Sequence, residues 1–100
     1  MEKIYVSGKM TGLSKRQILK KFNKAESLLT KKGFSVMNPA VAYYMKNIKD
    51  FSYDDWLKID FAMLDACDAI YMLNNYEDSL GAQKELDYAI KNKKAVIYEN

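Results

Sequence analysis

The sequence lacks histidine and has one cysteine and one proline among its 100 residues. A lone cysteine excludes an internal disulfide, and a zinc site is not expected without histidine or a cysteine pair. No apolar run approaches the ~20 residues that cross a membrane, and the chain passes from its start directly into the segment KIYVSG. We therefore expect a cytoplasmic protein without a metal, another cofactor or a membrane partner.

Arginine is also scarce, since Arg16 is the only one and the formal charge of +3 comes mostly from lysines. The arginine stripe with interleaved aromatics that is typical of nucleic-acid readout is missing, so no nucleic-acid partner is expected. The lysines at 31–32 and 91–94 stand where helices should end, and cations there complement the helix dipole. With 49% hydrophobic residues and no evident linker, residues 1–100 are expected to form a single domain.

Four β-rich runs alternate with three helical patterns along the chain. The expected strands cover residues 3–7, 34–39, 68–73 and 94–99. The expected helices cover residues 14–33, 53–66 and 79–92, and residues 40–51 are expected to form a loop with a helical turn. Such alternation implies βαβ crossovers, so we expect an α/β, three-layer, Rossmann-like (flavodoxin-like) fold around a four-stranded, mainly parallel sheet.

Polar and small residues follow the first three strands, where the ligand of a doubly wound fold binds. The residues after the first strand could cradle a phosphate, and those that begin the third helix could bind an anion through free N–H groups. The candidates for substrate binding are Ser7, Gly8, Lys9, Thr11, Asn38, Asp78, Ser79 and Gly81. A plain βα turn or a helix N-cap would use the same residue types, so both interpretations stay open.

Two carboxylates interrupt apolar helix faces. Glu85 shares a face with Ala82, Leu86 and Ala89, and a buried carboxylate is costly unless it is paired or hydrogen-bonded. Asp60 lies within the apolar pattern of the preceding helix. Two carboxylates near one sheet edge are the groups that glycosidic-bond cleavage needs, one acting at the anomeric carbon and the other on the proton. A semi-exposed helix face is the alternative for each.

Four segments together carry a resemblance to a known group of proteins: KIYVSGKMTGL, NPA, DFAMLDACDAIYML and DSLGAQKELDYAI. They look like the nucleoside 2-deoxyribosyltransferase-like superfamily, most closely its small uncharacterised members from phages and prophages. The chain also resembles the deoxynucleoside 5′-monophosphate N-glycosidases. The most specific part is the spacing from Asp60 to the CDAI segment and then to SLGAQKE, which ends in Glu85.

The resemblance implies a role for individual residues. Glu85 would be the nucleophile that attacks C1′ of a deoxyribose, and Asp60 would handle the proton of the departing base. Tyr5 would hold the glutamate, while Gly8 and Ser79 would line the sugar-phosphate site. The implied activity is cleavage or transfer of the N-glycosidic bond of a 2′-deoxynucleoside or its 5′-monophosphate.

The chain departs from these relatives in its first loop, in a loop before Ser79 that looks one residue longer, and at its C-terminal end. Lys9 and Thr11 stand where the glycosidases have a serine and an arginine that bind phosphate, and lysine lacks the planar fork of arginine. The transferases complete each site with C-terminal residues of a neighbouring subunit, whereas this sequence stops at Asn100. The end of the last strand would then serve, or that contribution is missing.

Two other classes of protein stay open beside the enzyme. One is a non-catalytic module that binds or sequesters a nucleotide, as a phage-type protein could. The other is a flavodoxin-like electron carrier, which is disfavoured because the first loop is not rich in hydroxyls and the chain is not acidic.

Aromatic residues and the sheet edges give two further expectations. The tyrosines in or beside the predicted loops could supply a base contact by stacking; they are Tyr43, Tyr44, Tyr53 and Tyr76. A short parallel sheet leaves two open edges, so we expect a homodimer or larger assembly, with Trp56 and the 53–64 helix near the interface.

Overall fold

The computed structural model describes residues 2–100 and has strands that alternate with helices along the chain. The strands are β1 (Lys3–Ser7), β2 (Ser35–Met37), β3 (Ala69–Met72) and β4 (Ala95–Tyr98). The α-helices are α1 (Lys15–Lys31), α2 (Tyr53–Asp65) and α3 (Leu80–Lys91). Two short 3₁₀ helices, η1 (Pro39–Tyr44) and η2 (Tyr76–Asp78), follow β2 and β3.

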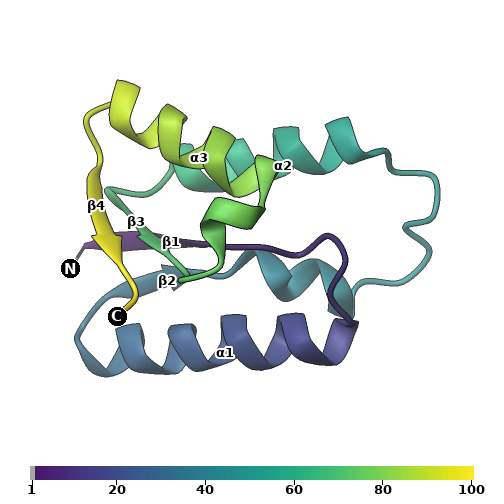
Figure 1. Cartoon of the computed structure of the whole chain (residues 1–100), viewed down its shortest axis with the longest axis horizontal. Coiled ribbons are helices and arrows are strands. Elements are labelled where there is room, and N and C mark those ends of the chain that lie inside the picture. The colour runs from purple at the N-terminus through teal and green to yellow at the C-terminus, as the bar shows by residue number, and fades with distance from the viewer. Residues whose placement is uncertain (1) are drawn as a thin grey trace.

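The strands form one sheet in the order β2-β1-β3-β4, and every pair is parallel. Helix α1 lies on one face of the sheet, and α2 and α3 lie on the other (Figure 1). This confirms the expected α/β, three-layer, Rossmann-like fold, with a sheet that is entirely rather than mainly parallel. Each connection between parallel strands must cross from one end of the sheet to the other, which is why helices cover both faces.

Strand β1 is central, and its side chains alternate between the two faces of the sheet. Ile4 and Val6 pack in the core beneath α1, whereas Tyr5 belongs to the core shared with α2 and α3. Ser7 follows Tyr5 by two residues and therefore points to the same side. Two polar side chains of one buried strand are thus directed at α3.

The expected caps are present. Ser14 with Gln17 forms a capping box at the start of α1, and Ser52 with Asp55 forms one at the start of α2. Ser79 caps α3, and its side chain accepts a hydrogen bond from the Ala82 N–H. These contacts satisfy N–H groups that have no partner within the helix, so each helix begins within one residue of its predicted start.

Strand lengths differ most from the expectation. The strand expected at 34–39 is shorter in the structure, because Asn38 leaves the sheet to cap η1 and Pro39 begins that 3₁₀ helix. Cys67 is buried, as expected for a core thiol. None of the helices formed by residues 2–100 combines the length and apolar character needed to span a lipid bilayer.

Candidate functional site

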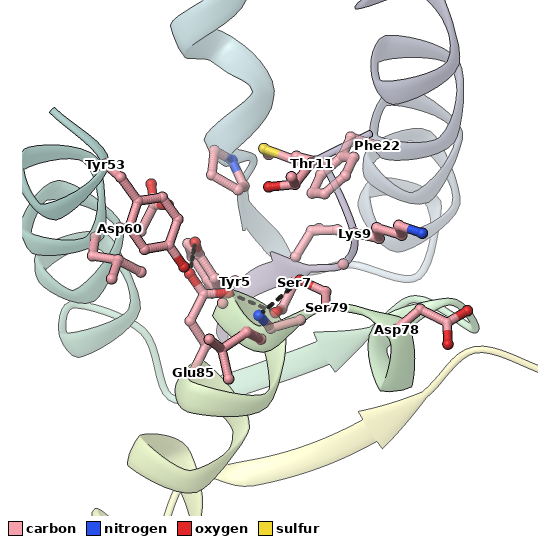
Figure 2. Close-up of a pocket in the computed structure, with 18 residues that line it drawn as sticks. Tyr5, Ser7, Lys9, Thr11, Phe22, Tyr53, Asp60, Asp78, Ser79 and Glu85 are labelled. Carbon is pink, nitrogen blue, oxygen red and sulfur yellow. Dashed lines mark hydrogen bonds between the residues drawn. The ribbon is translucent and has the colours of Figure 1, made fainter. Parts of the chain in front are cut away.

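A cleft of about 590 Å³ opens beside the carboxyl end of β1 (Figure 2). The end of β1 and the loop after it form its floor, α2 forms one side and the start of α3 forms another. The predicted site residues that line it are Tyr5, Ser7, Gly8, Lys9, Thr11, Asp60, Asp78, Ser79, Gly81 and Glu85. Its volume lies in the range of small-molecule sites.

Glu85 is the buried charge of this cleft, with 5% of its surface exposed. The Tyr5 hydroxyl donates to Glu85 Oε2 at 2.9 Å, and the Ser7 hydroxyl donates to Oε1 at 2.6 Å. The expected contact between Tyr5 and Glu85 is therefore present. Ser7, which the sequence suggested as part of a phosphate cradle, instead holds the second carboxylate oxygen.

These hydrogen bonds act against the cost of burial. Burial raises the pKa of Glu85, while the bonds from Ser7 and Tyr5 favour its ionised form and act in the opposite direction. The pKa of Tyr5 lies well above its usual value, first because of burial and then because of the charge on Glu85. Tyr5 consequently stays protonated and remains a donor to the glutamate.

Asp60 enters the same cleft from α2 and is partly buried. Its pKa is raised to about 7, first by burial and then by the negative charge of Glu85. The negative charge of Glu85 thus favours the protonated form of Asp60. Near neutral pH Asp60 is therefore a carboxyl group that can give up a proton, beside a Glu85 whose hydrogen bonds favour the carboxylate.

A second cavity of about 290 Å³ adjoins the cleft on the side of Asp60. The two cavities have in common Met10, Thr11, Pro39, Tyr53 and Asp60. The second cavity adds the aromatic rings of Tyr43 and Trp56 to this wall. Asp60 thus stands where a cleft that holds a carboxylate meets an aromatic pocket.

The first loop and the start of α3 form the other end of the cleft. Lys9 and Asp78 lie on the side opposite Asp60, with Ser79 between (Figure 2). The backbone N–H of Lys9 donates to Asn75 Oδ1 at 3.0 Å, which ties this loop to the segment after β3. Helix α3 presents its positive end here, and its first N–H groups have no partner within the helix.

Only a glycine fits at position 8 without a shift of its surroundings, because the Leu73 side chain packs closely against it. A Cβ atom at Gly8 would lie 2.6 Å from the Leu73 side chain, which is closer than atoms can pack. The glycine thus lets the first loop lie against the end of β3. The position of Lys9, the next residue, depends on that contact.

Asn38 is the predicted site residue that the structure does not bring into the cleft. Its side-chain Oδ1 accepts from the Ala40 N–H at 3.0 Å, and its side-chain Nδ2 donates to Asn23 and Glu26 of α1, each at 3.0 Å. It lines neither cavity described above. Its contacts fasten η1 to α1.

Several wall residues gave no signal of their own in the sequence. Phe22, Leu57 and Leu80 line the cleft but resemble ordinary core or surface residues. Of the tyrosines expected near the site, Tyr43 and Tyr53 line a cavity, while Tyr44 and Tyr76 line neither. Across residues 2–100, no cluster of three or more cysteine, aspartate or glutamate side chains is arranged to hold a metal ion.

The fold and the cleft define an α/β protein with a small-molecule-sized site at the carboxyl end of a parallel sheet, lined by the carboxyl groups of Asp60, Asp78 and Glu85. The chain belongs to the family described as "Domain of unknown function (DUF4406)", whose sequence profile matches residues 2–98. No curated protein and no solved structure matches the chain.

Proposed function

We propose that the protein cleaves or transfers the N-glycosidic bond of a 2′-deoxynucleoside or its 5′-monophosphate. The observation that carries the proposal is the Glu85 carboxylate, buried at the cleft wall and held through both oxygens by Tyr5 and Ser7, with Asp60 in the same cleft. A glutamate fixed in this way is oriented as a nucleophile. The resemblance to the deoxyribosyltransferase-like superfamily supports deoxyribose as the sugar.

The two carboxyl groups have separate tasks in the proposed reaction. A Glu85 oxygen attacks C1′ and forms a glycosyl ester, while the bond from C1′ to the base nitrogen breaks and its electron pair passes to the base. Asp60, with its pKa near 7, gives its proton to that base. Water, deprotonated by the Asp60 carboxylate, or a second base then attacks C1′ and releases Glu85.

The two cavities suit different parts of such a substrate. The sugar lies over Glu85, and the base lies toward Asp60 and the aromatic wall formed by Tyr43 and Trp56. The 5′ end then points to Lys9 and the start of α3, where a phosphate would meet one cation and the positive end of a helix. Asp78 at the same end opposes a phosphate, so a neutral 5′-hydroxyl is also accommodated.

A non-catalytic module that binds or sequesters a nucleotide is the second candidate. Lys9 and the start of α3 favour it, because both would retain a phosphate without any chemistry at Glu85. Such a module has no need for a carboxylate buried among hydroxyl donors, since an uncharged side chain would cost less there. The enzyme is therefore the preferred proposal.

The test is to incubate the protein with the common 2′-deoxynucleosides and their 5′-monophosphates, with and without a second free base, and to follow base release or exchange by chromatography. Glu85→Gln should abolish turnover, because an amide keeps the shape of the side chain but cannot form the ester. Asp60→Asn should slow turnover by roughly 10²- to 10⁴-fold. If the protein turns over no member of the panel but is stabilised by one of them, the binding module replaces the enzyme.

We also propose that the protein acts in the cytoplasm as a homodimer or larger assembly. Its single cysteine is buried and free, which suits a reducing compartment. Strands β2 and β4 are the edge strands of the sheet, and exposed apolar side chains lie just before α2 at Phe51 and on α2 at Ile59.

A further inference from the structure

Tyr53 is the aromatic residue among those that line both the cleft and the second cavity. It begins α2, where the capping box of Ser52 fixes the backbone. It lines both cavities, although 53% of its surface is exposed. Its ring stands beside Asp60, and its hydroxyl points toward α3 (Figure 2).

Gly81, at the start of α3, lies close to that hydroxyl. A Cβ atom at Gly81 would stand 3.3 Å from the Tyr53 hydroxyl oxygen, so an alanine there would push the tyrosine by a few tenths of an ångström. The next nearest atom, Ser79 Oγ, would lie at an ordinary 3.9 Å. The tyrosine is thus the one close neighbour that a side chain at this position would meet among residues 2–100.

The backbone gives no other reason for a glycine at this place. The glycines with positive φ in residues 2–100 are Gly12 and Gly33, and Gly81 has the conformation of its helix. Glycine loses more conformational freedom on folding than alanine, so alanine would be the more stable residue in this first turn of α3 if no neighbour opposed it. The room that Gly81 leaves for Tyr53 is thus one reason for a glycine here, beside the open approach that it gives a ligand to the start of α3.

We infer that Tyr53 is a specificity-determining residue whose ring divides the sugar and base compartments and stacks on the base, and that Gly81 acts as its positioning residue. The inference rests on the proposed function, because it takes the ligand to be a nucleoside or nucleotide. The planar ring of Tyr53 lines both cavities beside Asp60 and presents a face to any nucleobase, which makes the contact tolerant of base identity. The hydroxyl, seated near Gly81, sets how far the ring reaches into the cleft.

Trp56 provides a readout that does not require turnover. It is the only tryptophan of the chain, and it lines the second cavity, so its fluorescence reports a base bound there. Titration with 2′-deoxynucleosides and free bases should show that Tyr53→Ala weakens binding by about 5- to 150-fold, the effect of losing one stacked ring. Tyr44→Ala is the matched control, because Tyr44 is an exposed tyrosine of η1 that lines neither cavity.

A double-variant experiment tests the role of Gly81. Gly81→Ala should weaken binding and raise KM more than it lowers kcat, because it displaces the stacking ring and leaves Glu85 in place. The same change introduced together with Tyr53→Phe should have a smaller effect than it has alone, since the oxygen that the new methyl meets has been removed. A merely structural role of Gly81 would give the same loss in both backgrounds, and that result would overturn the positioning role.

The outcomes separate this inference from the proposed function. If Tyr53→Ala binds every probe as the unaltered protein does, the inference fails while turnover and the Glu85 variant still test the enzyme. If the protein turns over nothing but Trp56 fluorescence shows binding that depends on Tyr53, the catalytic proposal fails and the stacking residue stands. If no probe is bound or turned over, both are wrong. Circular dichroism of each variant checks that the fold is intact.

Discussion

Asp60→Asn should make the protein more stable at neutral and alkaline pH. The pKa of Asp60 is about 7 in the folded protein, against an ordinary value of 3.8, so the folded state holds its proton more tightly than the unfolded chain does. The stability that neutral Asp60 contributes is present below about pH 4 and is lost as the pH rises to about 7. An asparagine, which carries no charge at any pH, escapes that loss.

The magnitude follows from the size of the pKa change. A rise from 3.8 to about 7 corresponds in full to about 4 kcal/mol. Asp60 is only partly buried and solvent screens part of the effect, so we expect Asp60→Asn to add about 2 to 4 kcal/mol to the free energy of unfolding above neutral pH. The gain should shrink to a small fraction of that near pH 4, where the unfolded aspartate also takes up its proton.

Urea denaturation of both proteins at about pH 4 and about pH 8 measures the difference directly. Asp87→Asn is the matched control, because Asp87 is an exposed aspartate of α3 outside both cavities, and it should change stability by no more than about 0.5 kcal/mol. The reasoning is refuted if Asp60→Asn is no more stable than the unaltered protein near pH 8, or if the gain is the same at both pH values. A gain in stability with a loss of turnover is the usual signature of a residue kept for function.

The remaining predictions concern Lys9, Gly8 and assembly. Lys9→Ala should weaken the binding of a 5′-monophosphate by about 1 to 3 kcal/mol and that of the unphosphorylated nucleoside much less. Equal losses of affinity for the two ligands in calorimetric titrations would show that Lys9 does not bind the phosphate. Gly8→Ala would bring a methyl group within 2.6 Å of Leu73 and should lower the free energy of unfolding, measured by urea denaturation, by about 1 to 3 kcal/mol. An unchanged denaturation midpoint would show that the Leu73 side chain can move away without cost. Light scattering at micromolar concentration should show a dimer or larger, with an 11.6 kDa species alone as the contrary result.

The fold was predictable because local and long-range signals agree. Ser14 and Ser52 each precede a suitable capping partner, and the apolar spacing after them continues for a whole helix. Strand β1 is a continuous β-rich run, as expected of a strand buried on both faces. Strand β2 was overestimated because a side-chain cap, which depends on geometry after Pro39, ends it early.

The site was predictable only in part. Glu85 stood out because a carboxylate on an apolar helix face has to be explained, and the structure supplies Tyr5 and Ser7 as its partners. The role of Ser7 was missed although the expected strand 3–7 includes it: Ser7 follows Tyr5 by two residues and shares its face, but the polar residues that follow favoured a phosphate cradle. Tyr53 and Gly81 meet only through the packing of α2 on α3, which no spacing within either helix reveals.

Trapping a sugar on Glu85 is the most direct measurement of the central claim. The protein is incubated with a 2-fluoro-substituted nucleoside, which slows hydrolysis of the glycosyl ester. The protein is then digested, and the masses of the peptides are measured by mass spectrometry. The account predicts that the mass of the fluorinated sugar appears on the peptide containing Glu85 and is absent from the Glu85→Gln protein. Turnover of a natural substrate with the sugar trapped on another residue, or turnover that survives Glu85→Gln, would contradict it.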